Sequence, residues 1–152
     1  MTHTQDSLEV SQQIPAKREQ VFAAWAGPAP KDWFAPEDMQ IVSAEADVRV
    51  GGKFRLSMKG QDGQVHTCYG KYEEVVPDQR VVFTHQWEGQ KPVETRVTVK
   101  FEDDGPGTKV TLQQEGFEDP AEAKGHAEGW ASTLRSLAKQ FPKAKTASQQ
   151  PR

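Results

Sequence analysis

The 152-residue chain has one cysteine, Cys68, and no long apolar run. A single cysteine excludes an internal disulfide and supplies no set of thiolates for a metal site. No stretch approaches the ~18 consecutive apolar residues that a membrane-spanning helix needs. The first residues also lack a basic segment followed by an apolar one, as a signal peptide would have. We therefore expect a cytoplasmic protein without integral membrane association.

Neither sign of charge is in excess. The chain has 19 basic and 22 acidic residues, a formal net charge of −3, and the two signs are well mixed. A nucleic-acid-binding protein usually presents a basic stripe or an aromatic and basic platform, and the sequence has neither. We expect no nucleic-acid partner.

Apolar residues are also scarce, at 35% of the chain, and the mean hydropathy is −0.78. Such values are common in disordered chains, which cannot bury enough apolar surface to fold. Here, however, the apolar residues fall in periodic blocks between Leu8 and Phe141. We predict one domain over residues 8–141, a flexible N-terminus at 1–7 and a disordered polar tail at 142–152.

The first part of the domain predicts a strand followed by two short helices. Residues 8–14 alternate in polarity, as a strand with one buried face does. Pro15 suits the first position of a helix, where a missing N–H costs nothing. Apolar residues then recur at helical spacing as far as Trp25, and a second short helical turn is expected at residues 32–34.

From residue 40 the polarity pattern changes to a period of two, which predicts strands. Glycine and proline pairs separate these strands at Gly51-Gly52, Asp62-Gly63, Pro77-Asp78 and Gly107-Thr108. The pair Asp62-Gly63 predicts a hairpin turn with positive φ at both central residues. The pair Pro77-Asp78 predicts a type I turn. Because no helix lies between these strands, they must pair antiparallel.

A long helix is predicted at the C-terminal end. Asp119 is a suitable N-cap, Pro120 suits the first helical position and Glu122 the third. A single apolar stripe follows at spacings of three and four, consisting of His126, Trp130, Leu134, Leu137 and Phe141. This helix is the one element large enough to cover the apolar face of the sheet.

Several segments together resemble one known family. They are Arg49-Val-Gly-Gly-Lys-Phe54, Gly70-Lys-Tyr-Glu-Glu-Val-Val-Pro77, Arg80-Val-Val-Phe-Thr84, Val97-Thr-Val-Lys-Phe101 and Glu128-Gly-Trp130. In this order they resemble the START-like (SRPBCC, helix-grip) superfamily, and within it the branch of the activator of heat-shock-protein-90 ATPase homologues. The resemblance extends over residues 8–141.

The resemblance implies an α+β helix-grip fold, also found in Bet v-like proteins. In it a curved seven-stranded antiparallel sheet wraps around the long C-terminal helix, and two short helices follow the first strand. It further implies a cavity between sheet and helix that binds an apolar or amphipathic molecule, lipid-like or aromatic. Some members of the superfamily catalyse cyclisation or hydrolysis, and the branch is named for stimulation of a chaperone ATPase.

Strand parity identifies the side chains that point towards the helix. The ligand-binding residues predicted in this way are Phe54, Leu56, Met58, Phe83, His85, Trp87, Val97, Val99, Leu112, Gln114, Trp130 and Leu134. Large side chains such as Trp87 and Trp130 are also able to fill the space themselves. The pattern alone leaves a cavity and a filled core as alternatives.

His85 and Gln114 are the polar residues of this set. An imidazole on an apolar face can hydrogen-bond a ligand oxygen or act as a general base, so His85 is the one candidate catalytic residue. His126 is expected near the cavity mouth, and Cys68 is expected to be a small buried residue rather than a nucleophile.

The leading hypothesis is a binding protein for a small apolar molecule, without metal or cofactor, as a monomer or a homodimer. The alternatives are an enzyme of the cyclase or hydrolase type with His85 as base, and a chaperone-ATPase co-regulator or protein-interaction module. The helix stripe, the strand parity and the turns do not decide between them.

Overall fold

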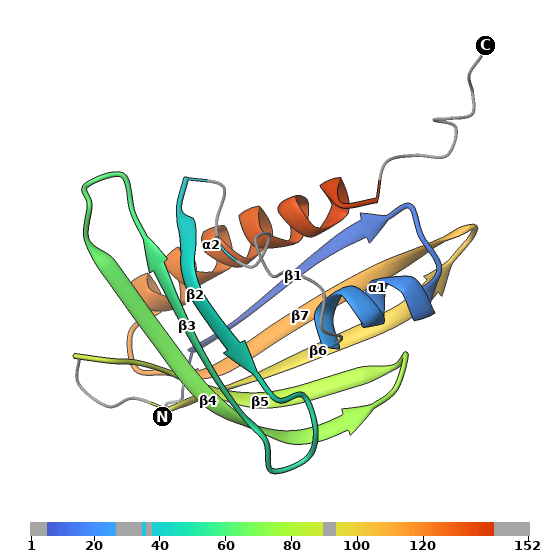
Figure 1. Ribbon diagram of the computed structural model, residues 1–152. Helices are drawn as coiled ribbons and strands as arrows, with labels where there is room; N and C mark the ends of the chain where they lie inside the picture. Colours follow the sequence, from blue (N-terminus) through green and yellow to red (C-terminus); the bar gives the residue numbers. More distant parts are fainter. Residues whose placement is uncertain (1–5, 27–34, 36–37, 90–93, 142–152) are drawn as a thin grey trace.

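The computed structural model describes residues 6–26, 35, 38–89 and 94–141 (Figure 1). Along the chain the elements are β1 (Asp6–Ile14), α1 (Arg18–Ala26), β2 (Gln40–Ala46), β3 (Lys53–Lys59), β4 (Val65–Val76), β5 (Arg80–Trp87), β6 (Thr95–Asp104), β7 (Gly107–Phe117) and α2 (Pro120–Lys139). The predicted domain therefore begins with a strand and ends with the long helix.

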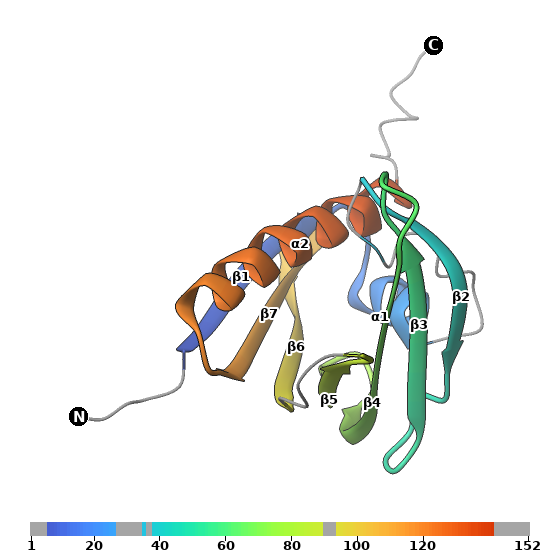
Figure 2. The ribbon, with the colours of Figure 1, turned by 90° about the vertical axis from the view of Figure 1, so that its left-hand side faces the viewer.

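The seven strands form one antiparallel sheet in the order β1-β7-β6-β5-β4-β3-β2. Strands β2 to β7 are joined as a meander, and β1 pairs with β7, at the other end of the sheet from β2. The sheet curls around α2, so that β2 and β3 rise on the side away from β1 (Figure 2). The predicted helix-grip α+β fold is confirmed.

Two of the predicted turns differ from the expectation. In the β3–β4 connection only Gly63 has a positive φ, of 84°, and Asp62 does not. The Asp62 carboxylate instead accepts the Gln64 N–H at 3.0 Å, which fixes a longer turn. In the β4–β5 turn Asp78 has φ of 64° directly after Pro77. Positive φ at that position defines a type II turn, so the type I prediction was wrong.

Helix α1 begins three residues later than the sequence indicated. Pro15 lies in a bend between β1 and the helix, where the Ala16 N–H donates to the Ile14 carbonyl at 2.8 Å. The first helical residue is Arg18. The aromatic side chain of Trp25 packs edge-on against Phe101 of β6. The short helical turn expected at 32–34 lies outside the described residues.

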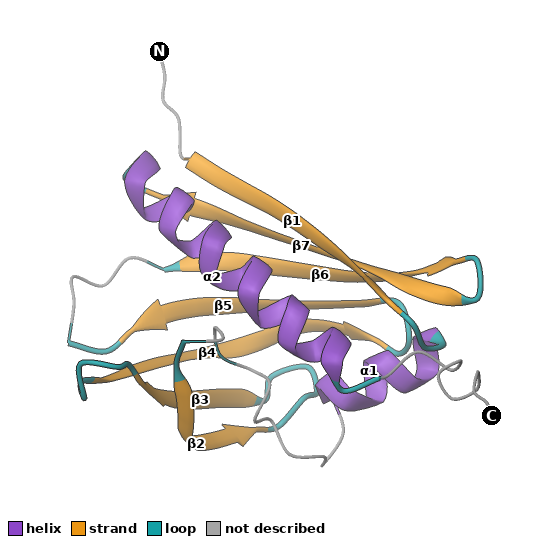
Figure 3. Ribbon diagram, turned by 90° about the horizontal axis from the view of Figure 1, so that it is seen from above, coloured by secondary structure: helices purple, strands orange, loops and turns teal. Residues whose placement is uncertain are grey.

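Helix α2 begins as predicted. The Asp119 side chain accepts the Ala121 N–H at 2.8 Å, and Pro120 occupies the first turn. The helix runs diagonally across the concave face of the sheet (Figure 3) and packs chiefly against β1 and then β7. Its buried residues Leu134 and Leu137 complete the core on that side. The packing therefore brings α2 onto one half of the sheet.

We predict that Gly70→Ala destabilises the fold. Gly70 lies opposite Phe54 in the β3–β4 ladder, and an added Cβ would overlap the Thr84 carbonyl oxygen and come within 2.7 Å of the Phe54 ring. Because the carbonyl belongs to the backbone of β5, relief requires movement of the sheet. We expect a loss of about 1–3 kcal/mol in the free energy of unfolding, measured by urea denaturation.

The matched control is Gly125→Ala on α2, where an added Cβ meets nothing within 4 Å. This change replaces glycine by the best helix-forming residue and should stabilise the protein by up to about 1 kcal/mol. A Gly70→Ala protein as stable as the unmodified chain would contradict the packing described here.

Candidate functional site

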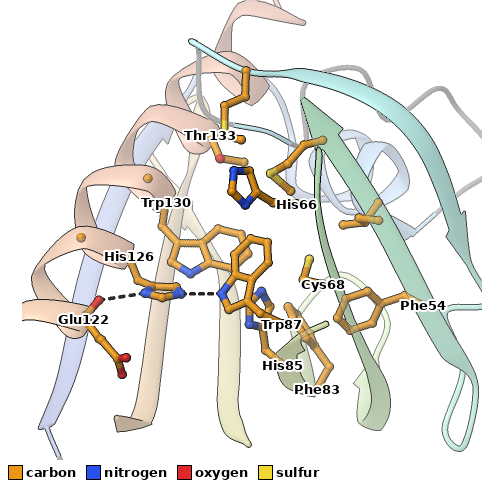
Figure 4. A pocket seen from close by; sticks show the side chains of 15 residues that line it. Phe54, His66, Cys68, Phe83, His85, Trp87, Glu122, His126, Trp130 and Thr133 are labelled. Atoms are coloured by element: carbon orange, nitrogen blue, oxygen red, sulfur yellow. Dashed lines mark hydrogen bonds between the residues drawn. The ribbon is translucent and has the colours of Figure 1, made fainter. Parts of the chain in front are cut away.

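A cavity of about 460 Å³ lies between residues 122–133 of α2 and strands β3 to β5 (Figure 4). Its walls combine inward side chains of the sheet with one face of the helix. The lining residues are Met39, Phe54, Leu56, Met58, His66, Cys68, Phe83, His85, Trp87, Glu122, Gly125, His126, Gly129, Trp130 and Thr133. The described structure therefore has an open cavity between sheet and helix.

Alternation along the strands builds the apolar wall. Phe54, Leu56 and Met58 occupy every second position of β3, and all three are buried. Phe83 on β5 meets the Phe54 ring edge-on, with centroids 5.2 Å apart. Such edge contacts stabilise aromatic pairs beyond simple burial of area. They hold the rings against the sheet and leave the space beneath the helix free.

Seven of the twelve residues predicted for the site line this cavity, and five do not. Those that line it are Phe54, Leu56, Met58, Phe83, His85, Trp87 and Trp130. Those that do not are Val97, Val99, Leu112, Gln114 and Leu134, all of which are buried. The reason is the position of α2, which packs on β1 and β7 and closes that half of the sheet.

Gln114 links the helix to the sheet. The Trp130 indole N–H donates to the Gln114 Oε1 at 2.7 Å, and the Gln114 amide donates to the Thr95 hydroxyl at 2.7 Å. That hydroxyl in turn donates to the His85 carbonyl at 3.0 Å. The Gln114 side chain is thus committed to this relay, which corrects the expectation that it faces a ligand.

The His85 side chain differs from that of Gln114 in having aromatic rings as its neighbours. Its side chain is buried among the rings of Phe54, Trp87, His126 and Trp130, at centroid distances of 5.3 to 6.4 Å. Among the described residues no group forms a hydrogen bond with the His85 ring nitrogens. Burial, and to a smaller degree the neighbouring His126, lowers its pKa from the ordinary 6.5 to about 3. At neutral pH the cavity therefore contains an uncharged imidazole able to donate one hydrogen bond and accept another.

His126 lies at the start of the helix and bridges to the sheet. The Trp87 indole N–H donates to His126 Nε2 at 2.9 Å, and His126 Nδ1 lies 2.8 Å from the Glu122 carbonyl oxygen (Figure 4). An indole N–H only donates and a carbonyl only accepts, so Nε2 must be bare and Nδ1 must carry the hydrogen. The two bonds fix His126 as the neutral Nδ1–H tautomer.

Cys68 is a cavity residue that the predicted binding set omitted. It is buried, and burial raises the pKa of its thiol to about 12, so it is not a thiolate nucleophile at neutral pH. Thr133 and Glu122 also line the cavity, and they lie at helical spacing from Trp130 and His126. This helical spacing is visible in the sequence and indicates that both residues belong to the helical wall of the cavity. No comparable sequence pattern indicated that Met39 and His66 line the cavity.

A second hollow, of about 530 Å³, is open to the outer face of the sheet and lined partly by charged groups. Across it the Arg55 guanidinium binds the Glu88 carboxylate in a bidentate pair at 3.0 Å. Two of the four charged residues that line this hollow are thus paired with each other, and the other two are Glu45 and Lys53. The described wall of the inner cavity is instead mainly apolar, with one acidic residue, Glu122. The inner cavity is therefore the candidate site.

Among the described residues no three His, Cys, Asp or Glu side chains converge in a way that holds a metal ion. Three of the four histidines of the chain line the cavity, but both ring nitrogens of His126 are engaged with protein groups. None of the helices in the described part is long and apolar enough to span a membrane.

A curled antiparallel sheet that grips a C-terminal helix and encloses an apolar cavity defines a START-like helix-grip protein. Residues 15–141 match the family described as Activator of Hsp90 ATPase homolog 1-like protein, and the chain belongs to that family. Comparison with curated protein sequences finds no match.

Solved structures of similar proteins support the same assignment. Protein CV1439 from Chromobacterium violaceum is 27% identical, with a TM-score of 0.80 over 89% of this chain and 96% of that one. The AHSA1 protein from Silicibacter pomeroyi is 26% identical, with a TM-score of 0.77 over 95% and 100% of the two chains. The Mll3558 protein from Rhizobium loti is 27% identical, with a TM-score of 0.76 over 91% and 98%.

We predict that Gln114→Leu destabilises the protein by about 1–3 kcal/mol. The substitution keeps the approximate volume but leaves the buried Trp130 indole N–H without its acceptor and removes the donor to Thr95. Gln113→Leu, at the adjacent position, is the matched control, because the Gln113 side-chain amide donates to the exposed carboxylate of Glu9. Urea denaturation of both variants measures the difference. Equal stabilities would contradict the relay.

We also predict that His85 makes the protein sensitive to acid. Below pH 6.5 the unfolded chain protonates this histidine, whereas the folded chain does not until the pH approaches 3. Stability is therefore lost as the pH falls through this window, by roughly 1 kcal/mol per pH unit from this group. In His85→Phe the free energy of unfolding should fall less steeply between pH 6.5 and 4, as measured by urea denaturation. Parallel pH profiles would refute this.

Proposed function

We propose that the protein binds a small apolar or amphipathic molecule in the cavity between α2 and strands β3 to β5. The observation that carries this proposal is the cavity of about 460 Å³, which remains open although Trp87 and Trp130 contribute to its walls. Its volume lies within the range of about 300–1,000 Å³ that is common for ligand pockets. Membership of the family supports the proposal, because similar folds hold hydrophobic ligands.

Simple energetics indicate a modest affinity from apolar contact alone. A ligand that buries ~300 Å² of apolar surface gains about 7 kcal/mol at ~25 cal/mol per Å². Association costs at least ~4 kcal/mol in lost translational and rotational freedom. The remainder corresponds to weak binding, so polar contacts within the cavity must contribute to affinity and specificity.

Acid–base catalysis is less well supported than binding. A general base works best with a pKa near the operating pH, and burial lowers the pKa of His85 to about 3. Among the described residues no titratable group lies within hydrogen-bonding distance of its ring. The His85 ring and the His126 ring have centroids 6.1 Å apart. These observations favour His85 as a ligand contact over His85 as a catalytic base.

The first test is native mass spectrometry of the protein purified from its own host. A co-purifying small molecule that is lost on denaturation would support the proposal. Stimulation of a chaperone ATPase by the ligand-free protein, together with no retained molecule, would instead favour the interaction-module alternative.

A substitution at the mouth provides the second test. Gly125 lines the cavity, and an added Cβ there meets nothing within 4 Å, so we expect the larger side chain of Gly125→Leu to narrow the entrance. We expect at least about tenfold weaker binding of the neutral fluorescent probe N-phenylnaphthylamine, measured by titration.

Lys124→Leu is the matched control. It adds the same side chain one position earlier on α2, at an exposed residue that does not line the cavity. This variant should bind the probe as the unmodified chain does. If both leucine variants bind the probe equally well, the probe does not occupy the cavity and the proposal loses its support.

A further inference from the structure

Some of the polar side chains that line the cavity are hydrogen-bonded within the protein, and others are not. The Trp87 indole and the His126 imidazole are engaged with each other, and the Trp130 indole donates to Gln114. His85 and Thr133 line the same cavity, are only 4% and 2% exposed, and form no side-chain hydrogen bond with any described residue. The polar atoms of these two side chains are not enclosed by protein but open onto the cavity. A ligand in the cavity can therefore supply their missing hydrogen-bond partner.

Formal charge is almost absent from the described part of the cavity wall. Among the described lining residues none is a lysine or an arginine, and the one acidic residue is Glu122, on the helix near the mouth. A carboxylate inside this space would meet no described lysine or arginine; among the described lining residues the partly exposed imidazole of His66 is the remaining candidate cation, and Glu122 adds a negative charge. Burying an unpaired carboxylate in an apolar site costs several kcal/mol. The cavity wall thus discriminates against acidic ligands.

From these two observations we infer that the cavity selects an uncharged ligand, an aromatic or aliphatic body with one hydroxyl or carbonyl group that hydrogen-bonds to His85. The inference rests on the proposed function and specifies the chemistry of its ligand. Thr133, on the opposite wall, provides a second neutral contact. The class excludes fatty acids and other carboxylates, although their apolar parts would fit the same walls.

The geometry of the surrounding rings supports an aromatic body. The ring centroids of Trp87 and Trp130 lie 5.3 and 6.0 Å from that of His85, and both indoles stand edge-on to the imidazole. A flat ligand inserted beside them has aromatic faces and edges available for offset or edge contacts. Its hydroxyl or carbonyl would then replace the missing partner of the imidazole.

The test compares naphthol, naphthalene and naphthoate, which share one ring system and differ in the polar group. Each is titrated at pH 7 by displacement of N-phenylnaphthylamine, with the histidine ring signals followed by NMR. We expect naphthol to bind about tenfold more tightly than naphthalene, the gain from one hydrogen bond. Naphthoate should bind at least about 100-fold more weakly than naphthol. The ring signals of His85 should shift with naphthol.

Two variants assign the effect to the imidazole. His85→Phe keeps an aromatic ring but removes the hydrogen-bonding atoms, and it should bind naphthol and naphthalene equally. His85→Gln retains a donor and an acceptor and should restore most of the preference. Leu112→Ala, at a buried residue that does not line the cavity, lowers stability and should leave the preference unchanged. It controls for effects of reduced stability.

The outcomes separate the two hypotheses. If naphthoate binds as tightly as naphthol, or if His85→Phe keeps the preference for naphthol, the inference is wrong while ligand binding stands. If none of the three compounds displaces the probe and the probe binds Gly125→Leu unchanged, the proposed function fails as well.

Discussion

The structure depends on a buried hydrogen-bonded path that begins at the indole of Trp130 and ends at the backbone of β5. Gln114 accepts from Trp130 and donates to Thr95, and Thr95 donates to the His85 carbonyl. A buried polar network is stable only when each member is satisfied, so the path permits one placement of the helix relative to the sheet. It sets the distance of α2 from β5 and with it the height of the cavity.

A second bond fixes the helix at its first turns. The Trp87 indole donates to His126, whose other ring nitrogen is bound to the Glu122 carbonyl. Both hydrogen-bonded connections end on β5, one at the Trp87 side chain and one at the backbone carbonyl of His85. With these two connections α2 packs chiefly on β1 and β7, and the cavity lies between the helix and strands β3 to β5. The two tryptophans that were candidates to fill the cavity are instead held against its walls.

His85 illustrates the cost of such a site. Its imidazole is surrounded by aromatic rings, so its charged form is disfavoured in the folded protein. A phenylalanine at this position would pack without that cost. Proteins commonly retain locally unfavourable groups where a ligand needs them. The unfavourable environment of His85 is consistent with a role as a neutral hydrogen-bonding contact rather than as a base.

The local pattern of the chain was sufficient for the fold and for the direction in which most buried residues point. Alternation in Phe54, Leu56 and Met58 identified the inner face of β3, and Asp119-Pro120 identified the start of α2. The same alternation placed His85 and Gln114 on one face, but it did not distinguish their roles. That distinction arose from tertiary structure, since α2 settles on β1 and β7, covers Gln114 and leaves His85 beside a cavity. Sequence periodicity records which face of an element is buried, whereas the position of a helix across a sheet follows from packing and hydrogen bonds between residues far apart in the chain.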